Sequence, residues 1–209
     1  NLLGTRHLLE ALSTATTPPV CTILASSANV YGNSTLEVLD ETADTRPAND
    51  YAVSKLAMEY LAKTYMTRLG IVITRPFNYT GVGQEPRYLI PKIVDHFKAR
   101  APHIELGNTD VARDFSDVRD VARAYRLLAE TQPLGETFNL CSGEATALET
   151  CITMASEITG HDIAVRVNPD FVRANEVKTL RGSSEKLDNA TGRERRYSIR
   201  DTLEWMLQY

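Results

Sequence analysis

Two short apolar runs constrain the fold of this chain more than any other feature of its sequence. Residues 20–26 and 71–74 are rich in β-branched side chains, and each run ends abruptly in polar residues. Such runs are typical of strands that are buried on both faces of a parallel sheet. Helical patterns at about residues 1–14 and 51–69 precede them, and this alternation predicts an α/β fold.

The rest of the chain continues the alternation, without an internal repeat or a low-complexity tract. Residues 33–50 are expected to form a surface loop. Asp50 and Thr146 are expected to cap helices, and Gly70 and Gly160 to end them. Further helices are expected at about residues 91–101, 117–130, 146–160, 184–191 and 198–207, and further strands at residues 104–106, 137–141 and 163–167.

A tyrosine and a lysine near the start of the second helix have a spacing that suits proton transfer. Tyr51 and Lys55 are four residues apart, so both side chains lie on one face of the helix. A fixed positive charge beside a phenol favours the phenolate and lowers the pKa of the phenol. The pair could exchange a proton with a substrate hydroxyl near neutral pH, although this spacing also occurs by chance on exposed helices.

The first predicted strand leads directly into a second set of polar side chains. Ser26 and Ser27 end it, and residues 28–32 (Ala-Asn-Val-Tyr-Gly) carry the chain away from the sheet. Ligands collect at this carboxyl edge in open α/β sheets. The order of a strand ending in Ser-Ser, a Val-Tyr-Gly turn, an acidic loop and Tyr-x-x-x-Lys resembles the active-site segment of the extended short-chain dehydrogenase/reductases that act on nucleotide-diphosphate sugars.

The resemblance continues through residues 75–81, 113–120 and 173–177, so it covers nearly the whole chain of 209 residues. It implies a Rossmann-like, doubly wound parallel sheet with a smaller C-terminal lobe that binds the substrate. The glycine-rich dinucleotide turn of the family does not occur in these residues. The chain therefore resembles the C-terminal two-thirds of such an enzyme.

The same resemblance suggests how the chain divides. Residues 1–82 are expected to belong to the NAD(P)-binding domain and to carry the Ser-Tyr-Lys site. Residues 83–209 are expected to form mostly the substrate lobe, with residues 108–141 returning to the main sheet.

The resemblance assigns the catalytic roles to three residues. Tyr51 would relay the proton, Ser27 would polarise the sugar oxygen and Lys55 would tune the tyrosine. A bound NAD or NADP would contact Tyr51, Lys55, Ser26 and Pro76, although Ser26 also suits a structural role. The residues that choose between NAD and NADP are expected upstream of this sequence.

The resemblance also supplies candidates for binding the nucleotide-diphosphate sugar. Arg113 and Arg173 match family positions that clamp the pyrophosphate, and a guanidinium suits this role because it pairs bidentately with phosphate oxygens. Asn78 ends a strand, where its amide could bond a phosphate or a sugar hydroxyl. Three further candidates have polar side chains near the expected pocket: Glu176, Lys92 and Arg87.

The residues that follow Ser27 bear on the type of reaction. Family members that expel water from the sugar place an acid there, whereas Ala28 and Asn29 cannot exchange a proton at neutral pH. A 4,6-dehydratase is thus disfavoured. Residues 75–84 and 176–183 look most like enzymes that handle GDP-6-deoxyhexoses. A 4-ketoreductase of such a sugar is the leading hypothesis, with an NAD-dependent 4-epimerase and an inactive sugar-nucleotide-binding fragment as alternatives.

The composition limits the other partners of the chain. A hydrophobic content of 43% can bury a sizeable core, and a net charge of −4 gives no basic field for nucleic acid. No apolar run is long enough to cross a bilayer. The three cysteines suggest neither a disulfide framework nor a metal site. A cytoplasmic protein is expected, and the resemblance adds a homodimer.

Overall fold

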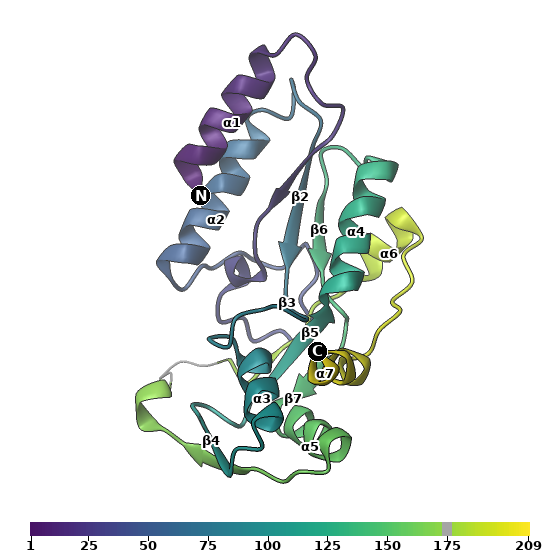
Figure 1. The fold of residues 1–209 in the computed structure, drawn as a ribbon. Coiled ribbons are helices and arrows are strands. Elements are labelled where there is room, and N and C mark those ends of the chain that lie inside the picture. The colour runs from purple at the N-terminus through teal and green to yellow at the C-terminus, as the bar shows by residue number, and fades with distance from the viewer. Residues whose placement is uncertain (173–176) are drawn as a thin grey trace.

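The computed structural model describes residues 1–172 and 177–209, and a parallel sheet organises its upper half (Figure 1). This main sheet consists of β1 (Thr22–Ala25), β2 (Ile71–Pro76) and β6 (Thr137–Leu140), in the order β1-β2-β6. The apolar residues 71–73 of the central strand β2 are buried, as predicted, and so are Thr74 and Arg75, which follow them. The run at residues 71–74 is therefore confirmed as a buried strand. The run at residues 20–26 is confirmed as a parallel strand, β1, but not as a buried one, because only Leu24 of β1 is buried.

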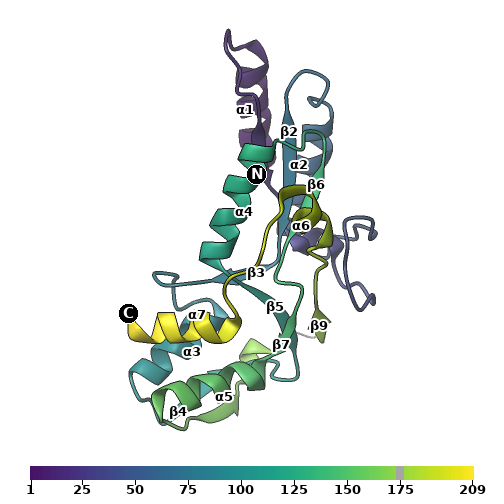
Figure 2. The same cartoon turned by 90° about the vertical axis from the view of Figure 1, so that its right-hand side faces the viewer.

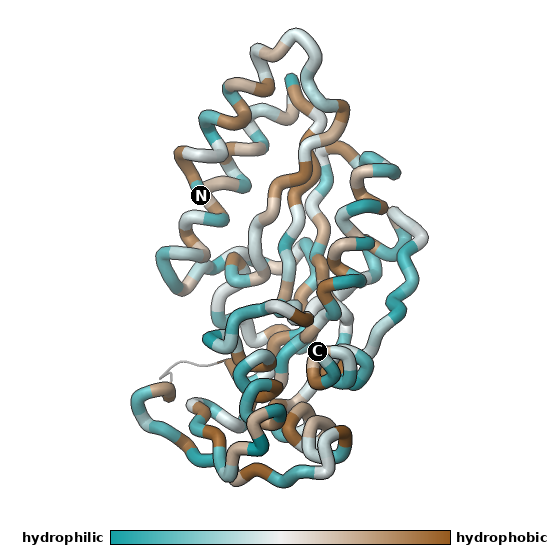
Figure 3. Tube along the Cα trace, in the orientation of Figure 1, coloured by the Kyte–Doolittle hydropathy of each residue, from teal (hydrophilic) through white to brown (hydrophobic). Residues whose placement is uncertain are grey.

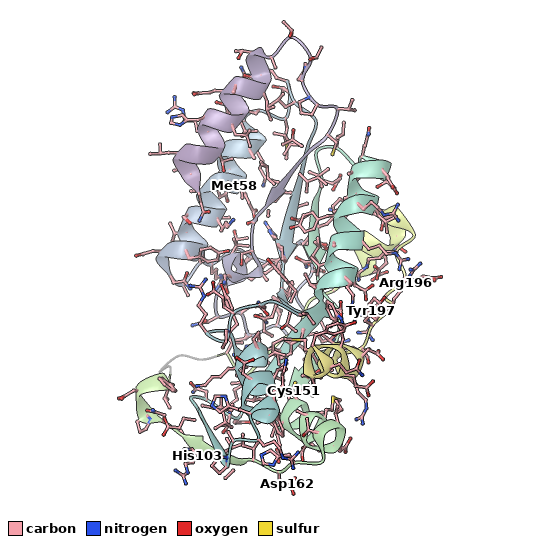
Figure 4. The ribbon with its side chains drawn as sticks, viewed as in Figure 1. Met58, His103, Cys151, Asp162, Arg196 and Tyr197 are labelled. Carbon is pink, nitrogen blue, oxygen red and sulfur yellow. The ribbon has the colours of Figure 1, made fainter. Side chains whose placement is uncertain are left out.

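Helices cover both faces of the main sheet (Figures 1 and 2). α1 (Leu2–Thr14) and α2 (Asp50–Lys63) lie side by side on one face, whereas α4 (Val118–Thr131) lies on the other, beside α6 (Glu185–Thr191). Apolar residues follow the strands between these layers (Figure 3). Met58, labelled in Figure 4, packs from α2 against Ile71 and Ile73, and Phe138 belongs to the core on the opposite side. The doubly wound arrangement is confirmed.

A second sheet lies below the carboxyl ends of the main strands (Figure 1). Its central strand β5 pairs in parallel with β3 and β9 and antiparallel with β7. The strands are β3 (Asn78–Thr80), β5 (Ala112–Asp117), β7 (Ala145–Ala147) and β9 (Thr179–Leu180). Of residues 108–141, α4 and β6 pack in the main-sheet layers, whereas β5 lies in this second sheet.

The lower part of the molecule is a helical lobe with its own core. α3 (Leu89–Lys98), α5 (Leu148–Thr159) and α7 (Ile199–Gln208) pack against one another around Phe97 and Cys151, the latter labelled in Figure 4. β4 (His103–Leu106) and β8 (Ala164–Val167) form a parallel pair at its edge. Two single turns of 3-10 helix, η1 (Ala28–Tyr31) and η2 (Pro169–Phe171), complete the described elements.

The structure corrects the predicted boundaries of two helices. Asn49, not Asp50, caps α2, because its side-chain oxygen accepts the N–H of Ala52 at 2.9 Å. α2 ends at Lys63 instead of continuing to residue 69. Gly70 lies beyond this end, where an added Cβ would come within 2.2 Å of the carbonyl oxygen of Val20, so close backbone approach requires the glycine.

The predicted cap of α5 is also wrong. Thr146 lies within β7, and the residue that precedes α5 is Ala147, which has no side-chain oxygen to act as a cap. Gly160 does end this helix in the left-handed conformation, with φ at 58°.

Candidate active site

The first turn of α2 presents Tyr51 to solvent at the carboxyl edge of the main sheet. The Asn49 cap fixes where the helix begins, so Tyr51 is its second residue and its side chain is 48% exposed. Lys55 follows one turn later, and its Nζ lies 5.8 Å from the centroid of the Tyr51 ring. The two side chains therefore share one helix face, as their spacing predicts.

Lys55 joins this helix to the end of β1. Its Nζ donates a hydrogen bond of 2.7 Å to the carbonyl oxygen of Ala25, the last residue of that strand. Burial lowers the pKa of the Lys55 ammonium from its ordinary value. An ammonium has three N–H donors. Two of them are thus able to face a ligand while the third holds the helix in place.

Ser27 lies two residues beyond Ala25 and is almost completely buried, at 8% exposure. Its Oγ accepts the N–H of Asn29 at 3.2 Å and so caps η1. A serine hydroxyl that accepts this bond can still donate its own proton. Because Lys55 bonds to Ala25 and α2 packs on η1, the structure brings Ser27, Tyr51 and Lys55 to the same end of β1.

The turn after Ser27 depends on a glycine. Gly32 has φ of +62°, and a Cβ at this position would lie 1.8 Å from the carbonyl oxygen of Arg46. Only glycine allows both the left-handed conformation and this approach. The loop at residues 33–49 therefore returns closely over η1 before α2 begins.

Ser26 and Lys55 fit a nicotinamide dinucleotide. Ser26 is 4% exposed, and its Oγ has no hydrogen-bond partner among the residues that the structure describes. A buried hydroxyl without a partner costs free energy unless a ligand or water satisfies it. This hydroxyl and the ammonium of Lys55 are donors of the kind that ribose hydroxyls accept. Pro76 ends the neighbouring strand β2 at the same sheet edge.

Asn78 and Arg113 lie on adjacent strands of the second sheet, just beyond this edge. Asn78 is exposed, and its Nδ2 contacts the carbonyl oxygen of Asp114 at 3.4 Å. Arg113 is half-buried, and its Nη1 donates to the carbonyl oxygens of Ala112 at 2.8 Å and Lys178 at 3.2 Å. The structure therefore brings these two candidates near each other across the β3–β5 pair.

The two weaker basic candidates already have partners. Lys92 donates from Nζ to the carbonyl oxygen of Glu105 at 2.6 Å and lies 4.7 Å from the centroid of the Phe171 ring. Arg87 is largely exposed and forms an ion pair of 2.9 Å with Glu85. Each of these contacts uses only part of the donor capacity of its side chain, since an ammonium has three N–H donors and a guanidinium has five.

The remaining two substrate candidates, Arg173 and Glu176, lie outside the described residues. Within residues 1–172 and 177–209, no group of three or more His, Cys, Asp or Glu side chains is gathered as a metal site would require. Over the same residues, the helices are too short or too polar to span a bilayer.

Comparison with known proteins identifies the family of this chain. The family model described as GDP-mannose 4,6 dehydratase matches residues 1–206. The chain belongs to this family. Its members also include enzymes with other names, so membership alone does not fix the reaction.

Two curated relatives of this family member carry the names of GDP-sugar oxidoreductases. A GDP-6-deoxy-D-talose 4-dehydrogenase from Aggregatibacter actinomycetemcomitans is 34% identical, over 99% of this chain and 70% of the relative. A GDP-6-deoxy-D-mannose reductase from Pseudomonas aeruginosa is 32% identical, over 99% of this chain and 71% of the relative.

Solved structures match the fold of this family member closely. A putative epimerase from Burkholderia cenocepacia is 57% identical with a TM-score of 0.97, over 99% of this chain and 68% of that one. RMD from Pseudomonas aeruginosa, solved as a complex with NADPH, is 32% identical with a TM-score of 0.91, over 99% and 71%. MoeE5, solved with UDP-glucuronic acid and NAD, is 28% identical with a TM-score of 0.89, over 100% and 70%.

The structure also reveals polar residues of this family member that the sequence did not single out. Below Tyr51 and Lys55, the side chains of Glu59, Arg75, Tyr31 and Asn139 are buried and bonded to one another. One signal could have identified Glu59, because it stands four residues after Lys55 on the same helix face. No spacing rule links the other three, which lie far apart in the sequence.

Proposed function

We propose that this protein is an oxidoreductase that transfers a hydride at C4 of a nucleotide-diphosphate sugar, as an NAD(P)-dependent 4-ketoreductase of a GDP-6-deoxyhexose. The observation that carries the proposal is the shared position of Ser27, Tyr51 and Lys55 at the carboxyl end of β1. Two curated relatives above 30% identity, both named as GDP-6-deoxyhexose oxidoreductases, support the choice of substrate.

The roles of the three residues follow from their chemistry. A nicotinamide cofactor, which Ser26 and Lys55 would help to hold, would supply a hydride to the C4 carbonyl carbon. The carbonyl π electrons move to oxygen, and the Tyr51 phenol donates its proton there, so that ketone, hydride and proton give the alcohol. Ser27 donates a hydrogen bond to the same oxygen, and the Lys55 ammonium stabilises the phenolate that remains.

Residues of the second sheet are proposed to hold the rest of the substrate. Arg113 would pair with the diphosphate through its guanidinium, and Asn78 would bond a sugar hydroxyl or a phosphate oxygen. The proximity of the two strands that carry them supports this assignment. Arg173 and Glu176 are proposed for the same pocket on the sequence resemblance. Lys92 and Arg87 are weaker candidates, because they lie on α3 and just before it and not on this pair of strands.

A 4-epimerase is the second candidate, and the 57% identity to a structure described as a putative epimerase favours it. Epimerisation would use the same three residues in both directions on one bound cofactor. The two reactions differ in what they consume, since a reductase uses external NAD(P)H stoichiometrically and an epimerase needs none. A dehydratase remains disfavoured because Ala28 and Asn29 supply no acid after Ser27.

The proposal extends to a homodimer in the cytoplasm. α1 and α2 lie side by side and expose large apolar side chains, with Leu3 67%, Val53 51% and Tyr60 60% exposed. Apolar side chains gathered on neighbouring helices favour association. The three cysteines are free thiols, which suits a reducing compartment. Sedimentation analysis of the full-length protein tests the dimer directly.

Replacement of Tyr51 by phenylalanine tests the proposed reaction. In the full-length protein, Tyr51→Phe removes only the phenolic hydroxyl and with it the exchangeable proton, so turnover of a GDP-4-keto-6-deoxyhexose with NAD(P)H should fall by roughly 10²–10⁴-fold. Tyr60→Phe is the matched control, because Tyr60 lies on the same helix and also has a lysine, Lys63, at 5.3 Å from its ring. The control should retain full turnover.

Three results would count against the proposal. Equal turnover by Tyr51→Phe and the wild type would show that Tyr51 does not relay the proton. Conversion of a 4-hydroxy sugar without added cofactor would favour the epimerase. Calorimetric binding of GDP without binding of NADH, and without turnover, would identify an inactive sugar-nucleotide-binding protein.

A further inference from the structure

A network of buried polar groups lies below the candidate active site and begins on α2, the helix that carries Tyr51 and Lys55. Glu59 stands one turn beyond Lys55 and is 1% exposed. Its carboxylate accepts two parallel hydrogen bonds from Arg75 of β2, from Nε at 3.0 Å and from Nη2 at 2.7 Å. This fork fixes the orientation of both groups, because neither can rotate without losing a charged hydrogen bond.

The network of hydrogen bonds continues from Arg75 to the segment that carries Ser27. Nη1 of Arg75 donates to the Tyr31 hydroxyl at 3.0 Å, and that hydroxyl donates to Oδ1 of Asn139 at 2.7 Å. Tyr31 is the last residue of η1, which Ser27 caps, and is 1% exposed. Burial raises the pKa of Tyr31 to about 12, so its hydroxyl keeps its proton and its role as donor.

The network ends on the neighbouring strand β6 and on the loop above it. Nδ2 of Asn139 donates to the carbonyl oxygen of Leu39 at 2.9 Å, and its backbone N–H donates to the carboxylate of Glu41 at 2.7 Å. Among the described residues, no buried side-chain polar atom of Glu59, Arg75, Tyr31 or Asn139 lacks a hydrogen-bond partner. α2, η1, β2 and β6 are therefore joined by directional bonds in addition to apolar packing.

A buried ion pair is weak evidence for stability, since apolar residues of the same size often stabilise a fold as well. In this protein, the directional hydrogen bonds of the Glu59–Arg75 pair can instead fix the relative position of the segments that they join. The three catalytic side chains come from two separate segments, η1 and α2, and no hydrogen bond joins Tyr51 to Ser27 among the described contacts. The network supplies a link between these segments, from Glu59 through Arg75 to Tyr31.

We propose that Glu59, Arg75 and Tyr31 are positioning residues that fix Ser27 relative to Tyr51 and Lys55. The inference rests on the proposed function, because it gives these residues a role in the same reaction. Reacting groups displaced by about 1 Å can lose roughly 100-fold in rate. Loss of one directional bond in the network should therefore lower kcat without changing substrate affinity.

Tyr31→Phe in the full-length protein is the first test. It removes one hydroxyl and keeps the ring, which packs 6.3 Å from the ring of Phe77. We expect kcat to fall roughly 10- to 100-fold, KM to stay within about twofold and the pH profile of kcat to be displaced. Tyr125→Phe is the matched control, because its hydroxyl bonds at 3.0 Å to Thr74, which directly precedes Arg75. The control should keep the kcat of the wild type.

A second pair of variants separates positioning from folding. Glu59→Gln keeps the size of the side chain but loses the charge and one of the two acceptors, and Arg75→Lys keeps the charge but loses the fork. Both should reduce kcat as Tyr31→Phe does. If Tyr31→Phe fails to fold, the kcat of Glu59→Gln decides between the two interpretations.

The outcomes distinguish this inference from the proposed function. One set of results would overturn this inference alone. In it the wild type is active and Tyr51→Phe is inactive, whereas the network variants are less stable but turn over normally. A wild type with no activity on any nucleotide-diphosphate sugar would overturn the proposed function. Reduced kcat with unchanged KM in the network variants and not in Tyr125→Phe supports both.

Discussion

Asp114 of β5 provides the sharpest test of how the second sheet is held together. Its side chain is completely buried and accepts four hydrogen bonds. Oδ1 accepts the N–H and the hydroxyl of Ser142, both at 2.7 Å, and Oδ2 accepts the N–H groups of Gly143 at 3.0 Å and Gly182 at 3.3 Å. One carboxylate thus joins β5 to the turn before β7 and to the segment after β9.

The variant Asp114→Asn exchanges one accepting oxygen for an amide group that cannot accept. The less costly orientation turns this group toward Ser142, whose hydroxyl can rotate to accept from it, so that one buried N–H loses its partner. Such a donor costs about 1–3 kcal/mol. Burial raises the pKa of Asp114, against the effect of its hydrogen bonds, so removal of the charge returns part of this cost. We expect a net loss of about 2 kcal/mol in the free energy of unfolding.

Urea denaturation followed by circular dichroism measures this loss. In a domain of 150–250 residues, 2 kcal/mol also lowers Tm by roughly 4–8 °C. Asp110→Asn is the matched control, since Asp110 is exposed and, among residues 1–172 and 177–209, pairs with the exposed Lys178 at 2.7 Å. Exposed ion pairs contribute little. If both variants unfold at the same urea concentration with the same slope, the account of Asp114 as an essential acceptor is wrong.

Two further predictions concern the turn after Ser27 and the buried thiols. Gly32→Ala should abolish most turnover and lower Tm far more than Gly135→Ala. Both glycines have positive φ, but of the two only Gly32 would place an added Cβ 1.8 Å from a backbone oxygen. Equal Tm values for the two variants would contradict this prediction. Burial raises the pKa of Cys141 and raises that of Cys151 to about 12, so a thiol reagent at pH 8 should modify the partly exposed Cys21 first. Reaction of all three thiols at one rate in the native protein, as expected in denaturant, would show that these cores open.

The sequence predicted the central strand of the main sheet because β2 begins with a continuous apolar run. Residues 71–74 need no partner information to be recognised as a buried strand. The sequence did not predict the strand β5, for the opposite reason. It contains Arg113, Asp114 and Asp117, and its carboxylates are satisfied by donors far along the chain, such as Ser142 and Thr202. A strand that buries charges through distant partners has no local signature.

The candidate site shows the same division. Ser27, Tyr51 and Lys55 could be found because two short segments carry recognisable patterns. The network of Glu59, Arg75 and Tyr31 could not be assembled, because its members lie 16 and 44 residues apart along the chain. The predicted end of α2 was likewise wrong, since Tyr65, Met66 and Leu69 continue the apolar pattern although the helix has ended.

The crossing of the chain between the two sheets has a consequence for protein engineering. After leaving the main sheet at Pro76, the polypeptide builds α3, β4 and β5 before α4 and β6 return to it. It then departs again through β7, and α6 comes back once more beside β6. Substrate specificity therefore cannot be transferred between relatives by joining two sequences at a single point, because each parent would then contribute segments to both sheets. A chimera needs a junction at every place where the chain passes from one sheet to the other.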